Sequence, residues 1–405
     1  MKARMFWSYA LWISIAVTVQ AAALWYIGRR LISTSYLPDR WRTVAWGGLV
    51  AMWLIPFVTM WLFRYIEGFW NGWAWITYTI LGFISLVFTA LVIRDLVLLS
   101  WTGVTWVASL FQRARAPATD PSRRQFLVQL SNLGVIGAAS VATAYGVYEA
   151  RRKPGIVNLH IPIKNLPPAF EGFRIVQFTD IHAGLTVKRD WVEVIAREVA
   201  GLNPDLIAFT GDLADGSVAH LREDVAPLGE LRAPFGKFFV TGNHEYYSGA
   251  GQWVEETGRM GYKVLMNEHE LITKNGSSFV LAGVTDYSAG SFIPEHKSDP
   301  KKAMDGAPQG TVKILMAHQP RSLYAAESLG FDLILNGHTH GGQFFPWNLV
   351  AALGQPYIKG LHNHNGSWVY VSKGTGYWGP PVRLGARSEI SVFTLTTAEK
   401  GSQST

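Results

Sequence analysis

The 405-residue chain contains no cysteine, and only 16% of its residues are charged. The absence of cysteine excludes disulfides, thiolate metal sites and thiol catalysis, but it does not assign a cellular compartment. The few charges are unevenly spread: residues 1–155 hold 15 Lys and Arg against 5 Asp and Glu, a net charge of +10, whereas residues 156–405 carry −3. Because the second part is mildly acidic, we predict no nucleic-acid partner despite the overall charge of +7.

The basic first part of the chain consists of long apolar runs separated by arginine-rich loops. Phe6–Ile27, Val44–Phe63 and Trp73–Ile93 each reach the roughly 20 apolar residues that a spanning helix needs. We therefore expect about three transmembrane helices within residues 1–115. The shorter apolar stretch Leu96–Phe111 is interpreted as a continuation of the third helix along the membrane interface. A separate span there would invert the topology.

Residues 116–155 form a different kind of segment. An arginine pair followed by Phe-Leu, in Ser122–Leu127, precedes a mildly apolar stretch, Leu133–Tyr148. The pattern resembles a bacterial twin-arginine export signal. The alternative is the basic flank of an ordinary spanning helix. We predict an uncleaved anchor and linker.

The arginine distribution predicts which side of the membrane the second part occupies. Arginines concentrate in the first and third loops, whereas the second loop has only Arg64. The positive-inside rule places the arginine-rich loops in the cytoplasm. We therefore predict a multi-pass protein of the bacterial inner membrane. Its residues after about 150 are expected on the outer, periplasmic side. Lys2, Arg4 and the basic run Arg151–Lys153 oppose this orientation.

Residues 156–397 alternate short apolar strands with amphipathic helices, as in a soluble α/β domain, and residues 398–405 form a tail. Strands are expected at 174–179, 206–210, 237–241, 313–317, 333–336, 366–372 and 390–395, with helices near 188–201 and 221–231. Asn275-Gly276 at the centre of 272–282 predicts a β-hairpin.

Side chains that can bind metal, together with one extra histidine, His244, directly follow five of these strands. They are Asp180 and His182, Asp212, Asn243 and His244, His318, and His338 and His340. Because ligands bind at the carboxyl ends of strands in α/β sheets, we expect these groups to converge. Oxygen and imidazole donors without thiolate suit Mn, Fe, Zn or Co. Two such ions can neutralise phosphoryl oxygens and lower the pKa of a water, so the pattern predicts a binuclear metal centre for phosphate esters.

The order of these blocks resembles the calcineurin-like metallophosphoesterase family, over about residues 156–397. The matching blocks are Asp180-Ile181-His182, Gly211-Asp212, Gly242-Asn243-His244-Glu245, His318 and Gly337-His338-Thr339-His340. Gly341-Gly342-Gln343, Tyr370–Gly374 and Pro381-Val382-Arg383 are similar to its membrane-associated bacterial branch. That branch includes twin-arginine-exported phosphoesterases and a UDP-2,3-diacylglucosamine pyrophosphatase of lipid A synthesis.

The resemblance implies a fold and a set of roles. The fold would be a four-layer αββα sandwich. Asp180, His182 and His340 would hold one metal ion, Asn243, His318 and His338 the second, and Asp212 would bridge them. His244 would contact the phosphate and protonate the leaving group.

The sequence departs from the family pattern at two positions. Glu245 replaces a common Asp and can still orient His244. Asp215 matches the pattern, but Gly216 stands where an Arg commonly grips phosphate. Arg383 is the predicted substitute for substrate binding, and the alternative is a surface arginine.

A few other residues have two readings. His362 and His364 are expected to be surface or core residues, although their spacing also suits a metal. Four aromatic residues can pack, contact a membrane surface or line a substrate groove: Trp347, Tyr357, Tyr377 and Trp378.

The sequence therefore predicts a membrane-anchored phosphoesterase that acts on phosphodiester or pyrophosphate bonds of a lipid-linked or envelope substrate. One alternative is a UDP-2,3-diacylglucosamine pyrophosphatase. A different class is a membrane sensor or scaffold whose second part binds a phosphoryl ligand without hydrolysing it. The full ligand set together with His244 favours an enzyme.

Overall fold

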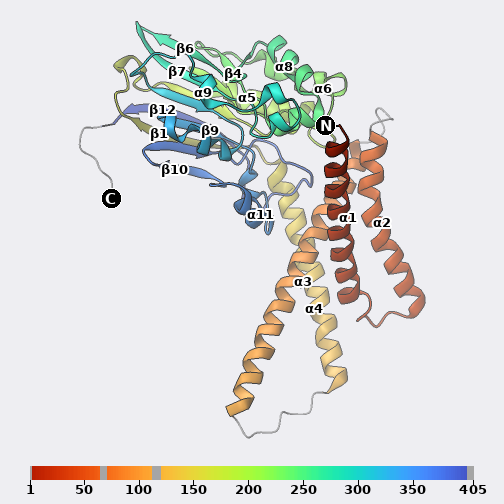
Figure 1. Cartoon of the computed structure of the whole chain (residues 1–405). Coiled ribbons are helices and arrows are strands. Elements are labelled where there is room, and N and C mark those ends of the chain that lie inside the picture. Colours follow the sequence, from red (N-terminus) through yellow and green to blue (C-terminus); the bar gives the residue numbers. More distant parts are fainter. Residues whose placement is uncertain (1, 64–70, 112–119, 399–405) are drawn as a thin grey trace. The chain divides into compact units, whose positions relative to one another are not determined.

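The computed structural model describes residues 2–63, 71–111 and 120–398 (Figure 1). The chain divides into two compact units, Met1–Val147 and Tyr148–Thr405. The boundary lies close to the point in the sequence where the apolar part gives way to the α/β part.

The first unit is helical. Its helices are α1 (Lys2–Leu31), α2 (Asp39–Phe63), α3 (Asn71–Phe111) and α4 (Pro121–Arg151). The last four residues of α4 belong to the second unit. Within the described residues, α3 and α4 are long and apolar enough to cross a membrane. Leu96–Phe111 continues the preceding helix without a break, as expected, and the spans in α1 and α2 stay predictions.

Polar side chains join three helices of this unit. Asp95 on α3 accepts from Tyr26 Oη at 2.5 Å and pairs with Arg30 of α1 at 2.6 Å. Arg94 pairs with Asp95 at 2.9 Å and donates to Asn132 of α4 at 2.6 Å. These charges are partly buried among apolar residues, where an unpaired charge is costly. Their pairing with one another lowers that cost.

The second unit contains two six-stranded sheets. In spatial order the first holds β1 (Gly155–Ile163), β12 (Glu389–Thr397), β2 (Arg174–Phe178), β3 (Leu206–Phe209), β4 (Lys237–Phe239) and β5 (Lys263–Val264). The second holds β10 (Gly360–His364), β11 (Ser367–Val371), β9 (Leu333–Asn336), β8 (Lys313–Met316), β7 (Ser277–Gly283) and β6 (Glu268–Lys274). Strands β2 to β5 are parallel, as are β7, β8, β9 and β11.

The two sheets pack face to face around one apolar core. It includes Ile175, Ala208 and Phe238 from the first sheet and Leu281, Ile314 and Leu335 from the second. Residues that alternate with these face outward, and Val280, Leu315 and Ile334 bury against a second cluster. This alternation is what a sheet covered on both faces requires.

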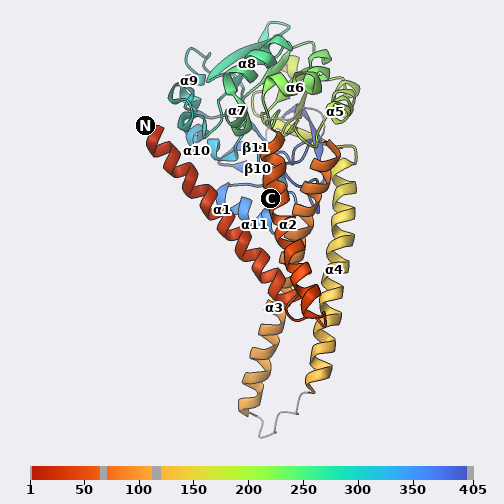
Figure 2. The same cartoon turned by 90° about the vertical axis from the view of Figure 1, so that its right-hand side faces the viewer.

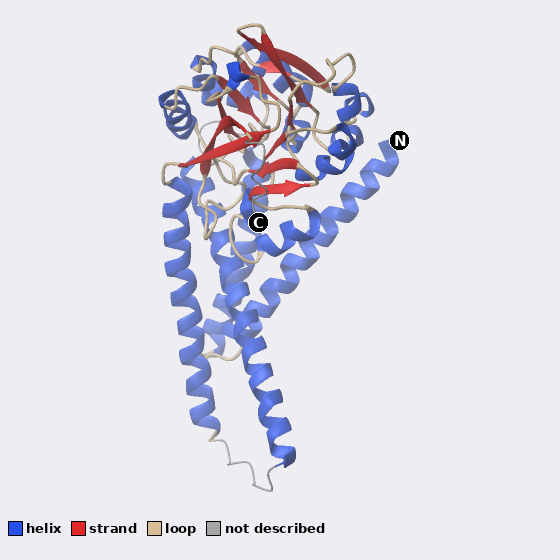
Figure 3. Cartoon of the chain, turned by 90° about the vertical axis from the view of Figure 1, so that its left-hand side faces the viewer, coloured by secondary structure: helices blue, strands red, loops and turns tan. Residues whose placement is uncertain are grey.

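Helices cover the outer faces, as Figures 2 and 3 show. They are α5 (Arg189–Gly201), α6 (Val218–Val225) and α8 (Ala250–Arg259) on the first sheet, and α9 (Pro300–Ala303) and α10 (Leu323–Ala326) on the second. Two further helices, α7 (Asn243–Ser248) and α11 (Trp347–Gly354), follow loops at the strand ends. The predicted four-layer αββα fold is confirmed.

Local signals explain where the expected elements agree and where they differ. The Asn275-Gly276 hairpin is confirmed, since both residues adopt the positive φ that a two-residue turn needs, at 50° and 76°. The helix expected at 221–231 is wrong at its end: α6 stops at Val225 and a 3₁₀ turn follows. Pro227 explains the change, because it lacks the amide hydrogen that an α-helix uses.

Candidate metal centre

The predicted donors converge at one edge of the sandwich. β2, β3 and β4 of the first sheet and β8 and β9 of the second each end immediately before one of the metal-binding blocks. The two sheets thus bring together groups that lie as much as 160 residues apart in the chain. Of the predicted donors, Asp180, Asp212 and His318 are fully buried or nearly so.

Five predicted ligands turn the chain in a left-handed conformation. Their φ angles are 55° at Asp180, 53° at His182, 54° at Asp212, 73° at His338 and 51° at His340. Such a conformation costs a non-glycine residue about 1–3 kcal/mol and persists only where the surroundings impose it. Its concentration at these positions indicates that the loops are shaped for the site and not for local stability.

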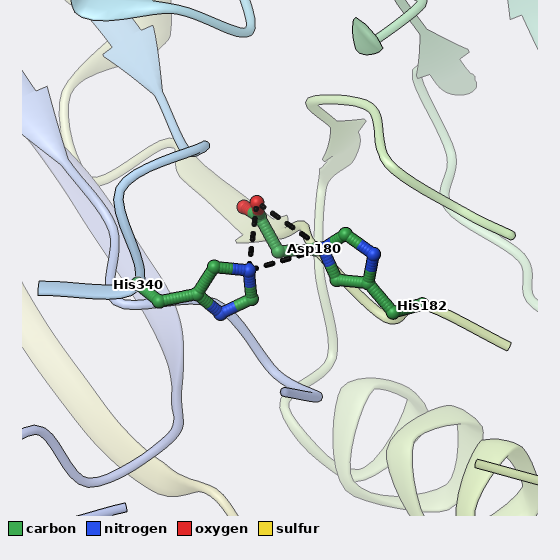
Figure 4. A group of neighbouring side chains, drawn as sticks. All are labelled: Asp180, His182 and His340. Carbon is green, nitrogen blue, oxygen red and sulfur yellow. Dashed lines mark hydrogen bonds and ion pairs between the residues drawn. The ribbon is translucent and has the colours of Figure 1, made fainter. Parts of the chain in front are cut away.

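Asp180, His182 and His340 form one cluster, drawn in Figure 4. Asp180 Oδ1 lies 3.5 Å from His340 Nε2 and 3.9 Å from His182 Nε2. The two imidazole Nε2 atoms are 3.0 Å apart. Three donor atoms thus face one another across a space that a single ion can share.

Asp212, His318 and His338 form a second cluster. His318 Nε2 lies 3.1 Å from Asp212 Oδ2 and 3.2 Å from His338 Nδ1. The same Oδ2 atom is 3.7 Å from His182 Nε2 of the first cluster. Asp212 therefore stands between the clusters, where a bridging carboxylate would be.

Asn243 supplies an independent indication that an ion fits here. Its Oδ1 atom is buried, and no group among the described residues donates a hydrogen bond to it. A buried acceptor without a partner is rare and needs an explanation. A divalent ion held with the second cluster would provide one, and the oxygen and imidazole donors present suit a transition metal.

One backbone carbonyl and one carboxylate determine which ring nitrogen of three histidines faces the site. His318 Nδ1 donates to the Thr210 carbonyl at 2.8 Å, which leaves Nε2 as the donor atom for a metal. His182 Nδ1 lies 2.9 Å and His244 Nδ1 2.6 Å from the same Asp215 oxygen. Asp215 is the orienting residue that the sequence interpretation missed, although its place in the family pattern was recognised.

The predicted role of Glu245 is wrong. Among the hydrogen bonds of the described residues, its carboxylate makes none to His244 but accepts from the backbone amides of Gly242 at 2.6 Å, Leu213 at 2.8 Å and Asp212 at 3.0 Å. Glu245 thus ties the β4 loop to the β3 loop. The reason is geometric: the side chain of the third residue of a helix reaches back to the amides before it.

Arg383 differs from both readings of the sequence. It is fully buried, so it is not a surface arginine, and it donates to the carbonyls of Gly376 at 2.9 Å, Ala386 at 2.6 Å and Lys373 at 2.7 Å. Its Nη2 also lies 3.0 Å from His340 Nδ1. Instead of the predicted substrate contact, the guanidinium holds the loop behind His340.

Two glycines permit the close approach of the loops. A Cβ at Gly242 would meet Asp212 Oδ1, and one at Gly337 would meet Asp180 Oδ2. Neither position has room for a side chain unless the carboxylate moves. These glycines are therefore required by the packing of the donors.

Some groups of the site, but not all, are held in the protonation states that metal binding needs. Burial raises the pKa of Asp180. Burial disfavours charge on His318, yet Asp212 and Asp180 raise its pKa well above the usual range, so metal binding there would displace protons. Burial opposes the charge on Asp212, but the nearby His318 and His244 rings outweigh it and keep its pKa well below the usual range. Burial, reinforced by His318, lowers the pKa of His338 to about 3. Burial also disfavours charge on His244, yet Asp212 and Asp215 raise its pKa to about 9. An ionised carboxylate and a neutral imidazole are the forms that bind metal.

The remaining candidates lie apart from these clusters. His362 stacks on Tyr357 with ring centroids 4.0 Å apart, and neither it nor His364 joins a potential metal group among the described residues. Tyr377 is buried and donates to the Thr186 carbonyl at 3.2 Å, so it packs. Trp378 is exposed, with its ring 5.9 Å from that of His244.

Known proteins are similar to this part of the chain. A family model described as calcineurin-like phosphoesterase matches residues 173–342. A metallophosphoesterase of Helicobacter pylori is 35% identical and aligns over 68% of this chain and 73% of its own length. The metallophosphoesterase YkuE of Bacillus subtilis is 30% identical over 68% of this chain and 97% of its own length.

An animal protein is also similar. A Danio rerio protein named "Transmembrane protein with metallophosphoesterase domain" is 38% identical over 267 residues, which cover 64% of this chain. The match spans 61% of that relative's length.

Proposed function

Because the chain belongs to the calcineurin-like metallophosphoesterase family, we propose that it is a membrane-anchored, metal-dependent enzyme that hydrolyses phosphodiester or pyrophosphate bonds. The main observation in support is the meeting of two buried donor clusters at Asp212. The buried Oδ1 atom of Asn243, which accepts a hydrogen bond from none of the described residues, adds to it. Structural packing alone does not require so many metal-binding groups in strained conformations at one place.

The residues would divide between two divalent ions of Mn, Fe, Zn or Co. The first would be held by Asp180, His182 and His340, the second by Asn243, His318 and His338, and Asp212 would contact both. When bound, such ions neutralise phosphoryl oxygens and lower the pKa of a water molecule.

His244 would act on the substrate. Its backbone amide donates to Asp212 Oδ1 at 2.9 Å, which fixes the residue beside the donor clusters. Its Nδ1 is engaged by Asp215, so Nε2 is the ring atom that would contact the phosphoryl group and give a proton to the leaving oxygen.

The membrane helices support a substrate in or near a bilayer. The proposed location is a bacterial inner membrane, with several spans, an uncleaved twin-arginine-like anchor and the second unit on the outer side. The apolar character of α3 and α4 and the arginine-rich loops favour this arrangement. A lipid-linked phosphate ester is the corresponding substrate class.

The decisive experiment compares the full chain in detergent with its Asp212→Asn variant. We expect two equivalents of transition metal in the wild type, with turnover of a generic phosphodiester that falls by roughly a thousandfold or more in the variant. Asp305→Asn changes an exposed aspartate and is the matched control. A folded wild type without metal and without turnover would refute the enzyme.

The alternatives give different results. A sensor or scaffold would retain phosphate binding without turnover. A pyrophosphatase of nucleotide-activated lipids would release a nucleoside monophosphate from UDP-2,3-diacylglucosamine, which product analysis detects.

A further inference from the structure

One helix of the second unit is apolar apart from Asn348, and it packs none of its residues in the core. The sequence of α11, Trp-Asn-Leu-Val-Ala-Ala-Leu-Gly, has no charged residue, and none of its residues is buried. The exposed apolar side chains of this segment are Phe345, Trp347, Leu349, Val350 and Leu353, which we call the α11 patch. Leu353 is 89% exposed. A helix that is apolar all round is ordinarily covered by protein or by lipid.

The α11 patch is attached to the metal centre at both ends of the helix. At its beginning, a Cβ on Gly342 would meet the backbone of Asn348, so α11 packs directly against the loop that carries His340. At its end, Gln355 Nε2 donates to Gln319 Oε1 at 3.2 Å, next to His318 in the chain. Whatever α11 contacts is therefore held beside the site.

Gln343 connects the same loop to the rim of the site. Its Nε2 donates to the carbonyls of Trp378 and Pro380, both at 3.0 Å, and its Oε1 accepts from the Trp378 amide at 3.0 Å. The exposed Trp378 ring, which lies against His244, is thus positioned by the loop that leads into α11.

The chain itself indicates what covers the patch. The candidate span α4 ends at Arg151, and β1 begins at Gly155. The three residues between them reach at most about 11 Å. The second unit is consequently tethered close to the end of a helix long and apolar enough to cross a bilayer, where aromatic and aliphatic side chains are favoured at the interface.

We propose that the α11 patch is a membrane-docking surface that inserts into the bilayer interface and presents the metal centre to phosphate esters of lipids. The inference rests on the proposed function for its substrate class, while the docking itself is a separate property. Insertion removes the five apolar side chains from water, and the attachment through Gly342 and Gln355 places the site at the level of lipid headgroups.

The absence of cysteine makes a direct test possible. Leu353→Cys, introduced into the full chain and spin-labelled, is reconstituted in vesicles of phosphatidylethanolamine and phosphatidylglycerol. The matched control is Leu271→Cys on β6, at the edge of the second sheet opposite to β10. We expect the label at 353 to have a much higher ratio of collisions with dissolved oxygen to collisions with a water-soluble nickel chelate than the label at 271, which remains open to the chelate.

Two outcomes would overturn the docking. A label at 353 as accessible to the nickel chelate as the one at 271 would show that the patch faces water. A label inaccessible to both reagents would show that protein covers the patch.

A second measurement separates the docking from the catalysis. Leu349→Asp combined with Leu353→Asp is expected to lower the turnover of a vesicle-embedded phospholipid ester by roughly tenfold or more, since charge opposes insertion. Hydrolysis of a water-soluble phosphodiester stays unchanged, and Leu271→Asp affects neither ester. Equal loss on both esters would overturn the docking. A wild type that hydrolyses neither ester refutes the proposed function, and the spin label still decides the docking.

Discussion

At the scale of single residues, Asp215 connects two imidazoles that have different proposed tasks. One of its oxygens lies 2.9 Å from Nδ1 of His182, a proposed ligand, and 2.6 Å from Nδ1 of His244, the proposed acid. A shared acceptor fixes both rings and the nitrogen that each presents to the site. Glu245, which follows His244 in the chain, accepts hydrogen bonds from backbone amides instead. The carboxylates of Asp215 and Glu245 therefore have different roles.

Asp215→Asn is therefore expected to weaken metal binding about 10–100-fold, the usual effect of losing a residue that orients a ligand. Turnover at saturating metal should also fall, because the amide no longer stabilises a charged His244. Metal titration followed by a phosphodiester assay checks both effects. Asp305→Asn serves as the control. Wild-type metal affinity and turnover in Asp215→Asn would contradict the positioning role.

At the scale of elements, the loops that follow neighbouring strands pack tightly against one another at the candidate metal centre. β3 and β4 are parallel neighbours, and their following loops meet where Gly242 touches Asp212. Glu245 completes this junction by accepting amide hydrogens from both loops. The junction thus sets the position of the carboxylate that stands between the clusters.

Gly242→Ala is expected to displace Asp212 and to abolish bound metal at stoichiometric concentrations, with a loss of stability of about 1–3 kcal/mol from overpacking. Gly251→Ala in α8 is the matched control, because a Cβ there meets nothing within 4 Å and alanine favours a helix. Metal content and thermal unfolding of the two variants check the prediction. Normal metal content in Gly242→Ala would contradict it.

At the scale of the whole molecule, the second unit buries two carboxylates that metal ions would compensate. Asp180 is 0% exposed and Asp212 is 1% exposed, and a buried carboxylate charge is costly unless opposite charges compensate it. Removal of the ions with a chelator should lower the unfolding temperature, and readdition of Mn or Zn should restore it. Saturating metal at a thousandfold excess over its Kd corresponds to about 4 kcal/mol of stabilisation.

Thermal unfolding of the full chain in detergent, with and without chelator, measures this effect. The shift should be much smaller in Asp212→Asn, which has lost the shared ligand. An unfolding temperature indifferent to the chelator would contradict a metal centre in this unit.

The membrane topology makes a further prediction at this scale. Because the chain has no native cysteine, single cysteines report the side of the membrane without interference. A membrane-impermeant maleimide should label Gln309→Cys on spheroplasts, whereas Asp120→Cys should react only after the membrane is permeabilised. Both residues are exposed. The reverse pattern would place the second unit in the cytoplasm.

The sequence by itself determined the apolar helices, the strands and which residues are candidate metal donors. These features follow from local causes: uninterrupted apolar runs, the turn preference of Asn275-Gly276, and donors placed directly after strands that share a sheet edge. The resemblance to the family, which rests on the order of these blocks in the chain, suggested the role of each donor. None of these inferences required knowledge of distant contacts.

Only the tertiary structure decided which groups act on one another. His244 is oriented by Asp215, 29 residues away, and not by the adjacent Glu245. The guanidinium of Arg383 donates its hydrogen bonds to backbone carbonyls. None of the residues of α11 is buried, although its apolar sequence is typical of a core helix. The physical reason is that the direction and burial of a side chain depend on what packs against it. Those neighbours come from parts of the chain that local sequence patterns do not connect.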